Sequence, residues 1–191
     1  LLKFEPMFHQ LIRLNMHAFR LLPQVLPLTL LIGLISFLPA CSQEAQSYEE
    51  ELESLYSHEV PLIQANKLHQ KLAEQDTVYL LDTRSPEEYQ VSCLRHAQRI
   101  GYDNFEEAEV QHIPKDATVV TYCTVGYRSE KIGEELEAMG FRNVYNLYGS
   151  MISWVNSGYQ VYTPGGTPTE KVHTYSEDWG QYLKKGQAVY E

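Results

Sequence analysis

The sequence predicts an α/β domain whose mainly parallel sheet is covered by helices on both faces. Two apolar runs, Thr77–Leu81 (TVYLL) and Thr118–Tyr122 (TVVTY), have the length and composition of buried strands. Patterns with helical spacing stand between such runs from residue 60 to residue 156. Strands that alternate with helices in this way indicate a parallel sheet, because each return to the start of the next parallel strand needs a crossover.

The individual elements follow from the same periodicities. The strands are predicted at Val60–Ile63, Thr77–Leu81, Ala97–Ile100, Thr118–Tyr122 and Val144–Leu147. The helices are predicted over a segment with Ala65, Leu68 and Leu72 on one face, over a short segment that starts after Ser85 and ends before Val91, and over Asn104–Val110, Ser129–Met139 and Ser150–Asn156. The helix after Ser85 has the clearest start, because Pro86 suits its first position and Glu88 can complete a capping box with Ser85.

Composition divides the chain into four parts. These are a signal peptide at 1–40, a polar and acidic tether at 41–57, the α/β domain at 58–162 and a C-terminal extension at 163–191. The tether has a helical pattern near Tyr48–Leu55, and the extension opens with a Pro/Gly-rich breaker before Trp179, Tyr182 and Leu183 recur at helical spacing. The extension is either a strap docked on the domain or a cover over the active site.

The first forty residues combine a basic start with an apolar stretch. Leu26–Leu38 is shorter than the roughly 20 residues that a membrane-spanning helix needs. It ends at Leu38-Pro39-Ala40-Cys41, which resembles the cleavage box of bacterial lipoprotein signal peptides. The resemblance implies that Cys41 is lipidated and holds the protein to the cell envelope, facing the periplasm, with the outer membrane favoured because Ser42 follows rather than aspartate. An uncleaved anchor helix is the alternative.

Charge narrows the range of partners. The chain has a net charge of −10, and residues 1–40 hold three basic residues and one acid, so residues 41–191 carry −12. Such a surface disfavours nucleic acid and direct adhesion to anionic lipid, so membrane contact is expected through the N-terminal lipid. The histidines show no metal-ligand spacing, so neither a metal nor a cofactor is predicted, and the sequence names no protein partner.

Cys123 is the candidate nucleophile, because it comes directly after a predicted buried strand and shortly before a predicted helix. Backbone N–H groups and the positive end of the helix dipole converge on such a loop and favour the thiolate. They can lower a cysteine pKa from about 8.5 to between roughly 3.5 and 7.5. Gly126 lets the backbone approach an anion closely, and Arg128 adds a fixed positive charge. The loop is therefore predicted to hold an anionic sulfur species.

Cys123-Thr124-Val125-Gly126-Tyr127-Arg128-Ser129 resembles the active-site loop of rhodanese-like domains, in which four residues separate the cysteine from an arginine. Leu80–Arg84 with Glu88 and Tyr89 resembles the first signature of that family. Ser92–Ala97 resembles its internal turn, and Leu147–Ser150 with Trp154 resembles its closing signature. The resemblance spans about residues 58–162.

The sequence departs from the family pattern at three positions. Cys93 stands where histidine is common, His96 where glycine is common, and Ser150 in place of a second glycine. None of the three lies in the catalytic loop.

The resemblance implies a rhodanese-like fold and a sulfurtransferase that moves sulfane sulfur from a small anionic donor such as thiosulfate to a thiol or cyanide acceptor. Cys123 would hold the sulfur as a persulfide. The implied substrate-binding residues are Thr124, Val125, Gly126, Tyr127, Arg128 and Ser129. Arg128 is expected to bind a sulfonate or to shape the loop, and Asp82 and Arg84 to support the site, with Asp82 structural rather than catalytic.

Two other functions fit the same loop. One is a persulfide relay or redox-sensing module that does not turn over. The other is a phosphatase of the class that shares the rhodanese fold, although its loop is one residue longer and usually follows a histidine, where this chain has Tyr122. Cys93 is expected to be inert and not to form a disulfide with Cys123.

Overall fold

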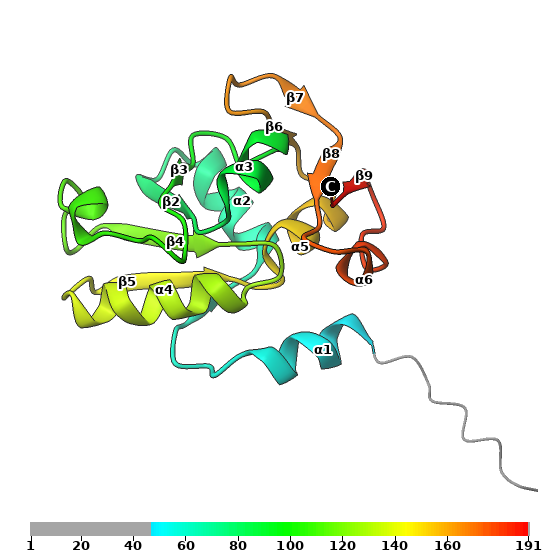
Figure 1. Cartoon of the computed structure of the whole chain (residues 1–191). Helices are drawn as coiled ribbons and strands as arrows, with labels where there is room; N and C mark the ends of the chain where they lie inside the picture. The colour runs from blue at the N-terminus through cyan, green and yellow to red at the C-terminus, as the bar shows by residue number, and fades with distance from the viewer. Residues whose placement is uncertain (1–46, 191) are drawn as a thin grey trace, which may run out of the picture. The chain divides into compact units, whose positions relative to one another are not determined.

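A parallel sheet forms the centre of the domain (Figure 1). The computed structural model describes residues 47–190, and within them this sheet has five strands in the order β1-β5-β4-β2-β3. The strands are β1 (Leu62–Ile63), β2 (Val78–Asp82), β3 (Gln98–Arg99), β4 (Thr118–Tyr122) and β5 (Asn143–Leu147). Every pairing in the sheet is parallel. The predicted α/β fold with a parallel sheet is therefore confirmed.

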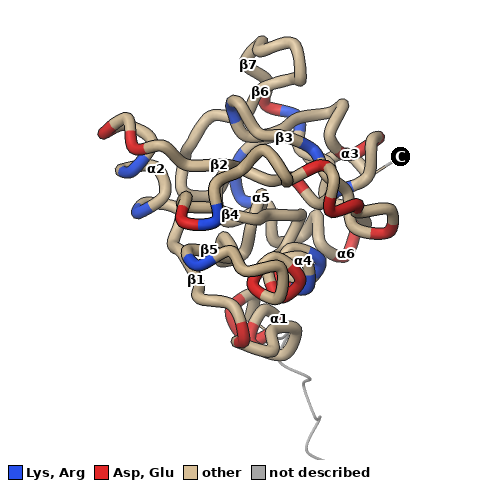
Figure 2. The backbone as a smooth tube through the Cα atoms, turned by 90° about the vertical axis from the view of Figure 1, so that its left-hand side faces the viewer, with Lys and Arg blue, Asp and Glu red and all other residues tan. Residues whose placement is uncertain are grey.

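Helices cover both faces of the sheet, as predicted. They are α2 (Ala65–Ala73), α3 (Pro86–Val91), α4 (Tyr127–Ala138) and α5 (Ser150–Asn156). Leu68 of α2 and Met151 of α5 pack on one face, and Leu136 of α4 packs on the other. In Figure 2, α2 accordingly lies on one side of strands β2, β4 and β5, and α4 lies on the other.

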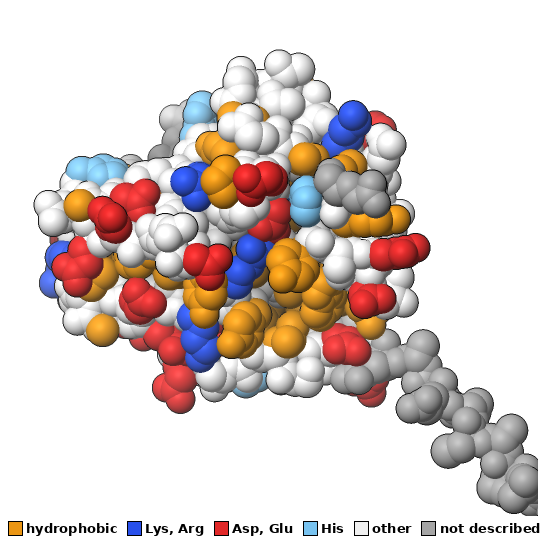
Figure 3. Space-filling view, in the orientation of Figure 1, with side chains coloured by type: hydrophobic (Ala, Val, Ile, Leu, Met, Phe, Trp, Pro, Cys, Tyr) orange, Lys and Arg blue, Asp and Glu red, His pale blue; other side chains and the backbone are white. Residues whose placement is uncertain are grey.

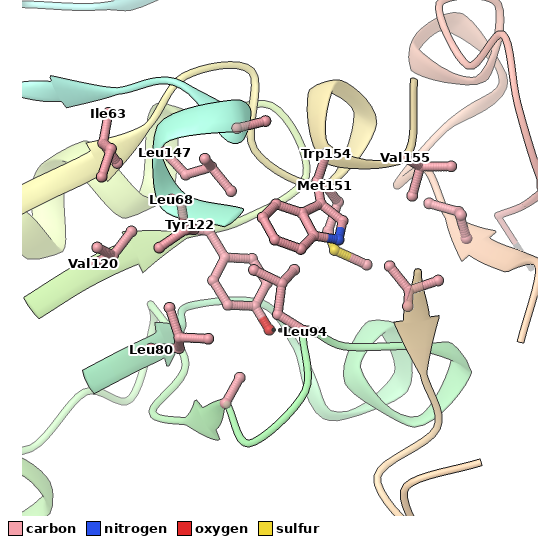
Figure 4. Packing of buried hydrophobic residues seen from close by; sticks show 14 residues of the cluster. Ile63, Leu68, Leu80, Leu94, Val120, Tyr122, Leu147, Met151, Trp154 and Val155 are labelled. Carbon is pink, nitrogen blue, oxygen red and sulfur yellow. Dashed lines mark hydrogen bonds between the residues drawn. The ribbon is translucent and has the colours of Figure 1, made fainter. Parts of the chain in front are cut away.

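The side-chain alternation along the strands divides the core into two layers. Leu80 and Val120 are partners across β2 and β4, and both point into the layer shown in Figure 4. Their neighbours Leu81 and Val119 point into the opposite layer under α4. Tyr122 lies in the first layer, fully buried, and its hydroxyl accepts the amide proton of Leu94 at 3.1 Å. Successive side chains of a strand face opposite sides, so a strand covered on both faces buries consecutive residues such as Val119 and Val120.

Two predicted helices differ from the observed ones. Only a 3₁₀ turn, η1 (Glu107–Val110), occupies the segment predicted as a helix at Asn104–Val110. The helix predicted from Ser129 starts at Tyr127 instead, because Gly126, with φ of 114°, reverses the chain directly into its first turn. Tyr127, Arg128 and Ser129 therefore lie on the first turn of α4 rather than in a loop.

The segment predicted as a tether is packed on the domain over part of its length. Residues Tyr48–Leu55 form α1, which starts at a complete capping box between Ser47 and Glu50. Leu52 is fully buried in a cluster with Tyr56, Val125 and Ile152. An apolar face that covers Val125 gives this short helix the tertiary support that its polar composition lacks.

The C-terminal extension is docked on the domain. It comprises β7 (Pro168–Thr169), β8 (Lys171–His173), α6 (Glu177–Gly180) and β9 (Gln187–Val189), and it follows β6 (Val161–Tyr162). Val172 and Thr174 are fully buried, and β8 packs against α3. The extension is therefore a strap docked on the domain, which was one of its two predicted roles. The other predicted role, a cover over the active site, depends on the pocket described below.

Some predictions fall on residues that the structure does not describe. The signal peptide at 1–40, Cys41 and the first residues of the predicted tether lie outside the described range. Across 47–190, none of the helices combines the length and the apolar character that crossing a bilayer requires.

Truncation of Leu52 tests whether α1 belongs to the folded unit. We expect Leu52→Ala to lower the free energy of unfolding by about 2–4 kcal/mol, because a fully buried leucine leaves a cavity. Glu53→Ala on the same helix, whose side chain is 58% exposed, should change it by less than about 0.5 kcal/mol. Urea unfolding of both variants measures this, and equal effects would show that α1 is not packed on the domain.

Candidate active site

Cys123 directly follows β4, at the carboxyl end of the sheet. A tight loop, Cys123–Gly126, connects β4 to α4. The cysteine is 1% exposed and lies at the base of a pocket of about 360 Å³ that also contacts Thr124, Val125, Tyr127 and Arg128. Ligands bind at the carboxyl ends of strands in open parallel sheets, and the predicted nucleophile lies at such a position.

The carbonyl oxygens of this loop all accept hydrogen bonds from other parts of the domain. The bonds are Met151 N to Cys123 O (3.2 Å), Ile152 N to Thr124 O (3.3 Å), the Tyr56 hydroxyl to Val125 O (2.6 Å) and Asn146 Nδ2 to Gly126 O (2.9 Å). The donors come from the start of α5, the residue after α1 and strand β5. The loop backbone is therefore fixed by three separate elements.

This backbone arrangement favours the thiolate of Cys123. The Gly126 amide donates to Sγ at 3.1 Å, and α4 directs its N-terminus at the same atom. Burial raises the pKa of Cys123, but the positive charge of Arg128 and the N–H groups of Ser129 and Gly126 outweigh burial, so the pKa lies below its ordinary value. Cys123 therefore has the character of a reactive cysteine rather than of a buried apolar residue.

Arg128 is paired with Glu88 of α3. Its Nη1 donates to Oε2 at 2.8 Å and its Nη2 to Oε1 at 2.7 Å, while the Thr124 hydroxyl donates to Oε1 at 2.7 Å. Burial raises the pKa of Glu88. The hydrogen bonds and the positive charge of Arg128, together with hydrogen bonds from Ser85 and Thr124, outweigh burial and lower this pKa to about 2. The Glu88 carboxylate thus connects α3 to Thr124 of the Cys123 loop and to Arg128 on the first turn of α4.

Asp82 and Arg84 form a second ion pair, which is fully buried at the end of β2. The Arg84 guanidinium donates to both carboxylate oxygens of Asp82 and, at 2.6 Å, to the carbonyl of Ser92. The pair lies under the site and does not line the pocket. Asp82 and Arg84 therefore hold backbone at the end of β2 and at Ser92, and neither contacts the Cys123 pocket.

Comparison with known proteins agrees with this geometry. A family model described as a rhodanese-like domain matches residues 64–157. A sulfurtransferase of Allochromatium vinosum is 33% identical over 104 residues, which are 54% of this chain and 96% of that protein. This chain belongs to the rhodanese-like family. A tRNA uridine(34) hydroxylase of Cytophaga hutchinsonii is 36% identical over 88 residues, but the match covers only 28% of the hydroxylase.

Solved structures show the same rhodanese-like fold. A thiosulfate sulfurtransferase of Pseudomonas aeruginosa superposes with a TM-score of 0.51 at 20% identity, over 65% of this chain and 23% of that one. A protein of Bacillus halodurans superposes with a TM-score of 0.50 at 18% identity, over 61% of this chain and 83% of that one. At these identities the likeness concerns the fold.

At two positions where the rhodanese-like pattern has glycine, this chain has another residue but keeps a backbone conformation that is typical of glycine. His96 has φ of 64° and Ser150 has φ of 46°, both in the left-handed region. Ser150 also adds a contact, because its hydroxyl oxygen accepts the amide proton of Cys123 at 3.0 Å. The serine therefore helps to hold Cys123, a role that the sequence did not predict for it.

The structure brings most of the predicted loop residues to the pocket, but not all of them. Thr124, Val125, Tyr127 and Arg128 line it. Ser129 is fully buried behind the loop, where its Oγ lies 2.7 Å from Oδ1 of Asn146. Its side chain is therefore placed to support the loop backbone rather than to contact a substrate.

Sequence reasoning missed Tyr56, Asn146 and the pairing of Glu88 with Arg128. Tyr56 accepts the amide proton of Gly149 at 2.9 Å in addition to its bond to Val125 O. Asn146 is an amide inside the strand predicted at Val144–Leu147, and it is fully buried. A polar residue inside a buried strand is the one signal that marks Asn146, because such groups need internal partners.

Cys93 differs from Cys123 in its electrostatic surroundings. It is 4% exposed, and its amide donates to Tyr162 O at 2.7 Å. Burial raises its pKa. Both cysteines are free thiols in the structure.

Two glycines with left-handed backbones provide a matched test of the loop. A Cβ at Gly126 would lie 2.2 Å from the Tyr56 hydroxyl oxygen, whereas a Cβ at Gly140 would meet nothing within 4 Å. We expect Gly140→Ala to cost about 1 kcal/mol of backbone strain, and Gly126→Ala to cost more and to abolish the enhanced reactivity of Cys123. Urea unfolding and the rate of alkylation by iodoacetamide measure the two effects. Equal behaviour of the variants would contradict the close packing of the loop on Tyr56.

Acid titration tests the Glu88–Arg128 pair. A carboxyl whose pKa falls on folding stabilises the protein above its unfolded-state pKa and loses this effect as pH falls through its folded pKa. We therefore expect the free energy of unfolding to decline between pH 4.5 and about 2, and Glu88→Gln to reduce that decline while lowering stability at neutral pH. Urea unfolding over a pH series measures it, with the exposed Glu137→Gln as the control. The same decline in Glu88→Gln as in the unchanged protein would refute the assignment.

Proposed function

We propose that this protein is a sulfurtransferase that carries sulfane sulfur as a persulfide on Cys123, taking it from a donor such as thiosulfate. Membership of the rhodanese-like family and the similarity to a sulfurtransferase over 96% of its length support a sulfurtransferase-type function. The observation that carries the proposal is the Gly126 amide at 3.1 Å from Sγ, in a loop whose carbonyls are bound elsewhere.

In the first step, the Cys123 thiolate attacks the outer sulfur of the donor. The donor S–S bond breaks, sulfite leaves with the electron pair when the donor is thiosulfate, and the outer sulfur remains on Cys123 as a persulfide. A lowered thiol pKa keeps the attacking thiolate populated at neutral pH.

In the second step, a thiolate or cyanide acceptor attacks the outer sulfur of the persulfide. The S–S bond to Cys123 breaks, and the cysteine returns as a thiolate. Between the two steps the outer sulfur carries negative charge, which N–H donors can stabilise. Within residues 47–190, the amides of Thr124 and Val125 donate to no protein acceptor, so they are available for this role.

The ion pair at Arg128 favours sulfur transfer over phosphate-ester hydrolysis. A phosphoryl group needs several donors on its oxygens, and an arginine clamp normally supplies two of them. Here Nη1 and Nη2 of Arg128 both donate to Glu88. We infer that Arg128 shapes the loop and contributes its charge, and that it does not act as a clamp.

The similarity to tRNA uridine(34) hydroxylases does not carry hydroxylation to this chain. The shared part is 88 residues, which are 44% of this chain and only 28% of the Cytophaga hutchinsonii protein. The net charge of −12 for residues 41–191 also opposes a nucleic acid substrate.

We also propose that Cys41 is lipidated and holds the domain to the periplasmic side of the cell envelope, on the grounds of the Leu38–Cys41 box. Expression in a bacterium with labelled palmitate should give a labelled protein in the membrane fraction. Cys41→Ser should lose both the label and the membrane association. A wild-type protein without label, still in the membrane fraction, would favour the uncleaved anchor helix instead.

Intact mass spectrometry tests the persulfide directly. After reduction and incubation with thiosulfate, the protein should gain the mass of one sulfur atom, and cyanide should remove it and release thiocyanate. Cys123→Ser should gain nothing, and Cys93→Ser should behave like the wild type. Absence of the gain with every sulfur donor tested would refute the proposed function. Loading without turnover would identify a relay.

A further inference from the structure

The mouth of the Cys123 pocket is built partly from segments outside the rhodanese-like match. Leu55 comes from α1, and Tyr175 and Trp179 come from the C-terminal extension, whereas the match covers residues 64–157. Tyr102 and Tyr127 complete the apolar and aromatic walls. In Figure 3, hydrophobic side chains gather on this face between α1, α4 and α6. The surface that a donor meets before it reaches Cys123 therefore depends on the two flanks of this chain.

The extension that supplies Tyr175 and Trp179 is held firmly. Val172 and Thr174 are fully buried on either side of His173. The Asn156 side chain of α5 donates to Tyr182 O at 2.8 Å and accepts the Lys184 amide at 2.6 Å. These contacts place the aromatic wall in a defined position over the pocket.

The mouth has no excess of positive charge. Among the described residues that line the pocket, Arg128 is the one base and Asp103 the one acid. Two nitrogens of Arg128 already donate to the Glu88 carboxylate. Acidic residues are also spread along α1 and α4 (Figure 2), and both helices contribute residues to the pocket lining. A dianion such as thiosulfate therefore loses hydration when it enters the pocket, and no unpaired basic side chain of the lining forms an ion pair with it to offset that loss.

Tyr175 covers the remaining face of Arg128. Its ring centroid lies 5.3 Å from Cζ of Arg128, and its side chain is 60% exposed. Its backbone has φ of 69°, and its amide donates to Nδ1 of His173 at 3.1 Å. A bulky residue takes this conformation only where its surroundings impose it. The structure thus presents an aromatic ring, rather than an open guanidinium, at the mouth.

We propose that this pocket selects an organic sulfane-sulfur donor with an apolar or aromatic body and a charge of at most −1, in preference to thiosulfate. Tyr175 and Trp179 are the specificity-determining residues, because they contact the body of the donor and not its reacting sulfur. The inference rests on the proposed sulfurtransferase function and narrows its donor class.

An aryl thiosulfonate, Ar–SO₂–S⁻, illustrates the chemistry. The Cys123 thiolate attacks the outer sulfur, the S–S bond of the donor breaks, and the aryl sulfinate Ar–SO₂⁻ leaves with the electron pair. Cys123 then carries the persulfide anion, so two negative charges stand on each side of the step. An acceptor thiolate or cyanide later removes the outer sulfur and restores the thiolate.

Three donors distinguish the effect of the donor's charge from the effect of its organic body. Thiosulfate is a dianion, methanethiosulfonate is a monoanion with a small body, and benzenethiosulfonate is a monoanion with an aromatic body. We measure kcat/KM of the full chain for each donor, with cyanide as acceptor. Each kcat/KM is then divided by the rate at which the same donor reacts with a simple thiol, which corrects for the intrinsic reactivity of the donor. The corrected values should rise from thiosulfate through methanethiosulfonate to benzenethiosulfonate, with at least about tenfold between the extremes.

Variants then test the residues. Tyr175→Ala and Trp179→Ala should each lower the ratio of benzenethiosulfonate to methanethiosulfonate about three- to tenfold, since each removes apolar contact area from the donor body. Tyr190→Ala, an exposed aromatic residue of the same extension away from the pocket, should leave the ratio unchanged. Asp103→Asn should raise kcat/KM for thiosulfate more than for the two monoanions.

The possible outcomes are distinct. A corrected preference for thiosulfate, or an unchanged ratio in both aromatic variants, would overturn the inference while the sulfurtransferase function stands. Failure of all three donors to load Cys123 would overturn the proposed function itself. If Trp179→Ala unfolds, Tyr175→Ala decides the question, because that side chain is 60% exposed and its removal leaves the core intact.

Discussion

The environment that favours a thiolate at Cys123 depends on hydrogen bonds that hold the carbonyl oxygens of its loop. Met151, Ile152, the Tyr56 hydroxyl and the Asn146 amide each bind one carbonyl of Cys123–Gly126. With its acceptors occupied elsewhere, the loop can direct its N–H groups and the N-terminus of α4 at Sγ. Such an arrangement stabilises negative charge on sulfur without any reorganisation during the reaction. Gly126 is required because Tyr56 leaves no room for a side chain there.

Two buried ion pairs surround this loop, and they have different consequences. Asp82 and Arg84 are fully buried and connect the end of β2 to the carbonyl of Ser92. Glu88 and Arg128 lie beside the pocket and connect α3 to both ends of the loop. Buried ion pairs contribute little net stability, because desolvation offsets the attraction between the charges. Their value here is geometric, since each fixes a segment that approaches Cys123.

The flanks outside the rhodanese-like match are part of the working site. Tyr56, which follows α1, binds the loop from behind, and Leu55 lines the pocket in front. The extension adds Tyr175 and Trp179 to the same pocket. The rhodanese-like region thus supplies Cys123 and its electrostatic surroundings, while segments outside residues 64–157 line the pocket in front of it.

The sequence by itself determined the parallel sheet, the helices on both faces and the position of Cys123, because these follow from local periodicity and from a contiguous motif. It also marked Glu88, through the capping box with Ser85, but not the pairing of Glu88 with Arg128. That pair, and those of Tyr56 with Val125 and of Asn146 with Gly126, join residues 40, 69 and 20 positions apart. The sequence predicted a tether where α1 packs, since eight polar-rich residues become a stable helix only against Val125 and Ile152. Contacts between distant segments leave no periodic trace along a chain, so only the tertiary structure could decide which side chains hold the loop and which form the mouth of the pocket.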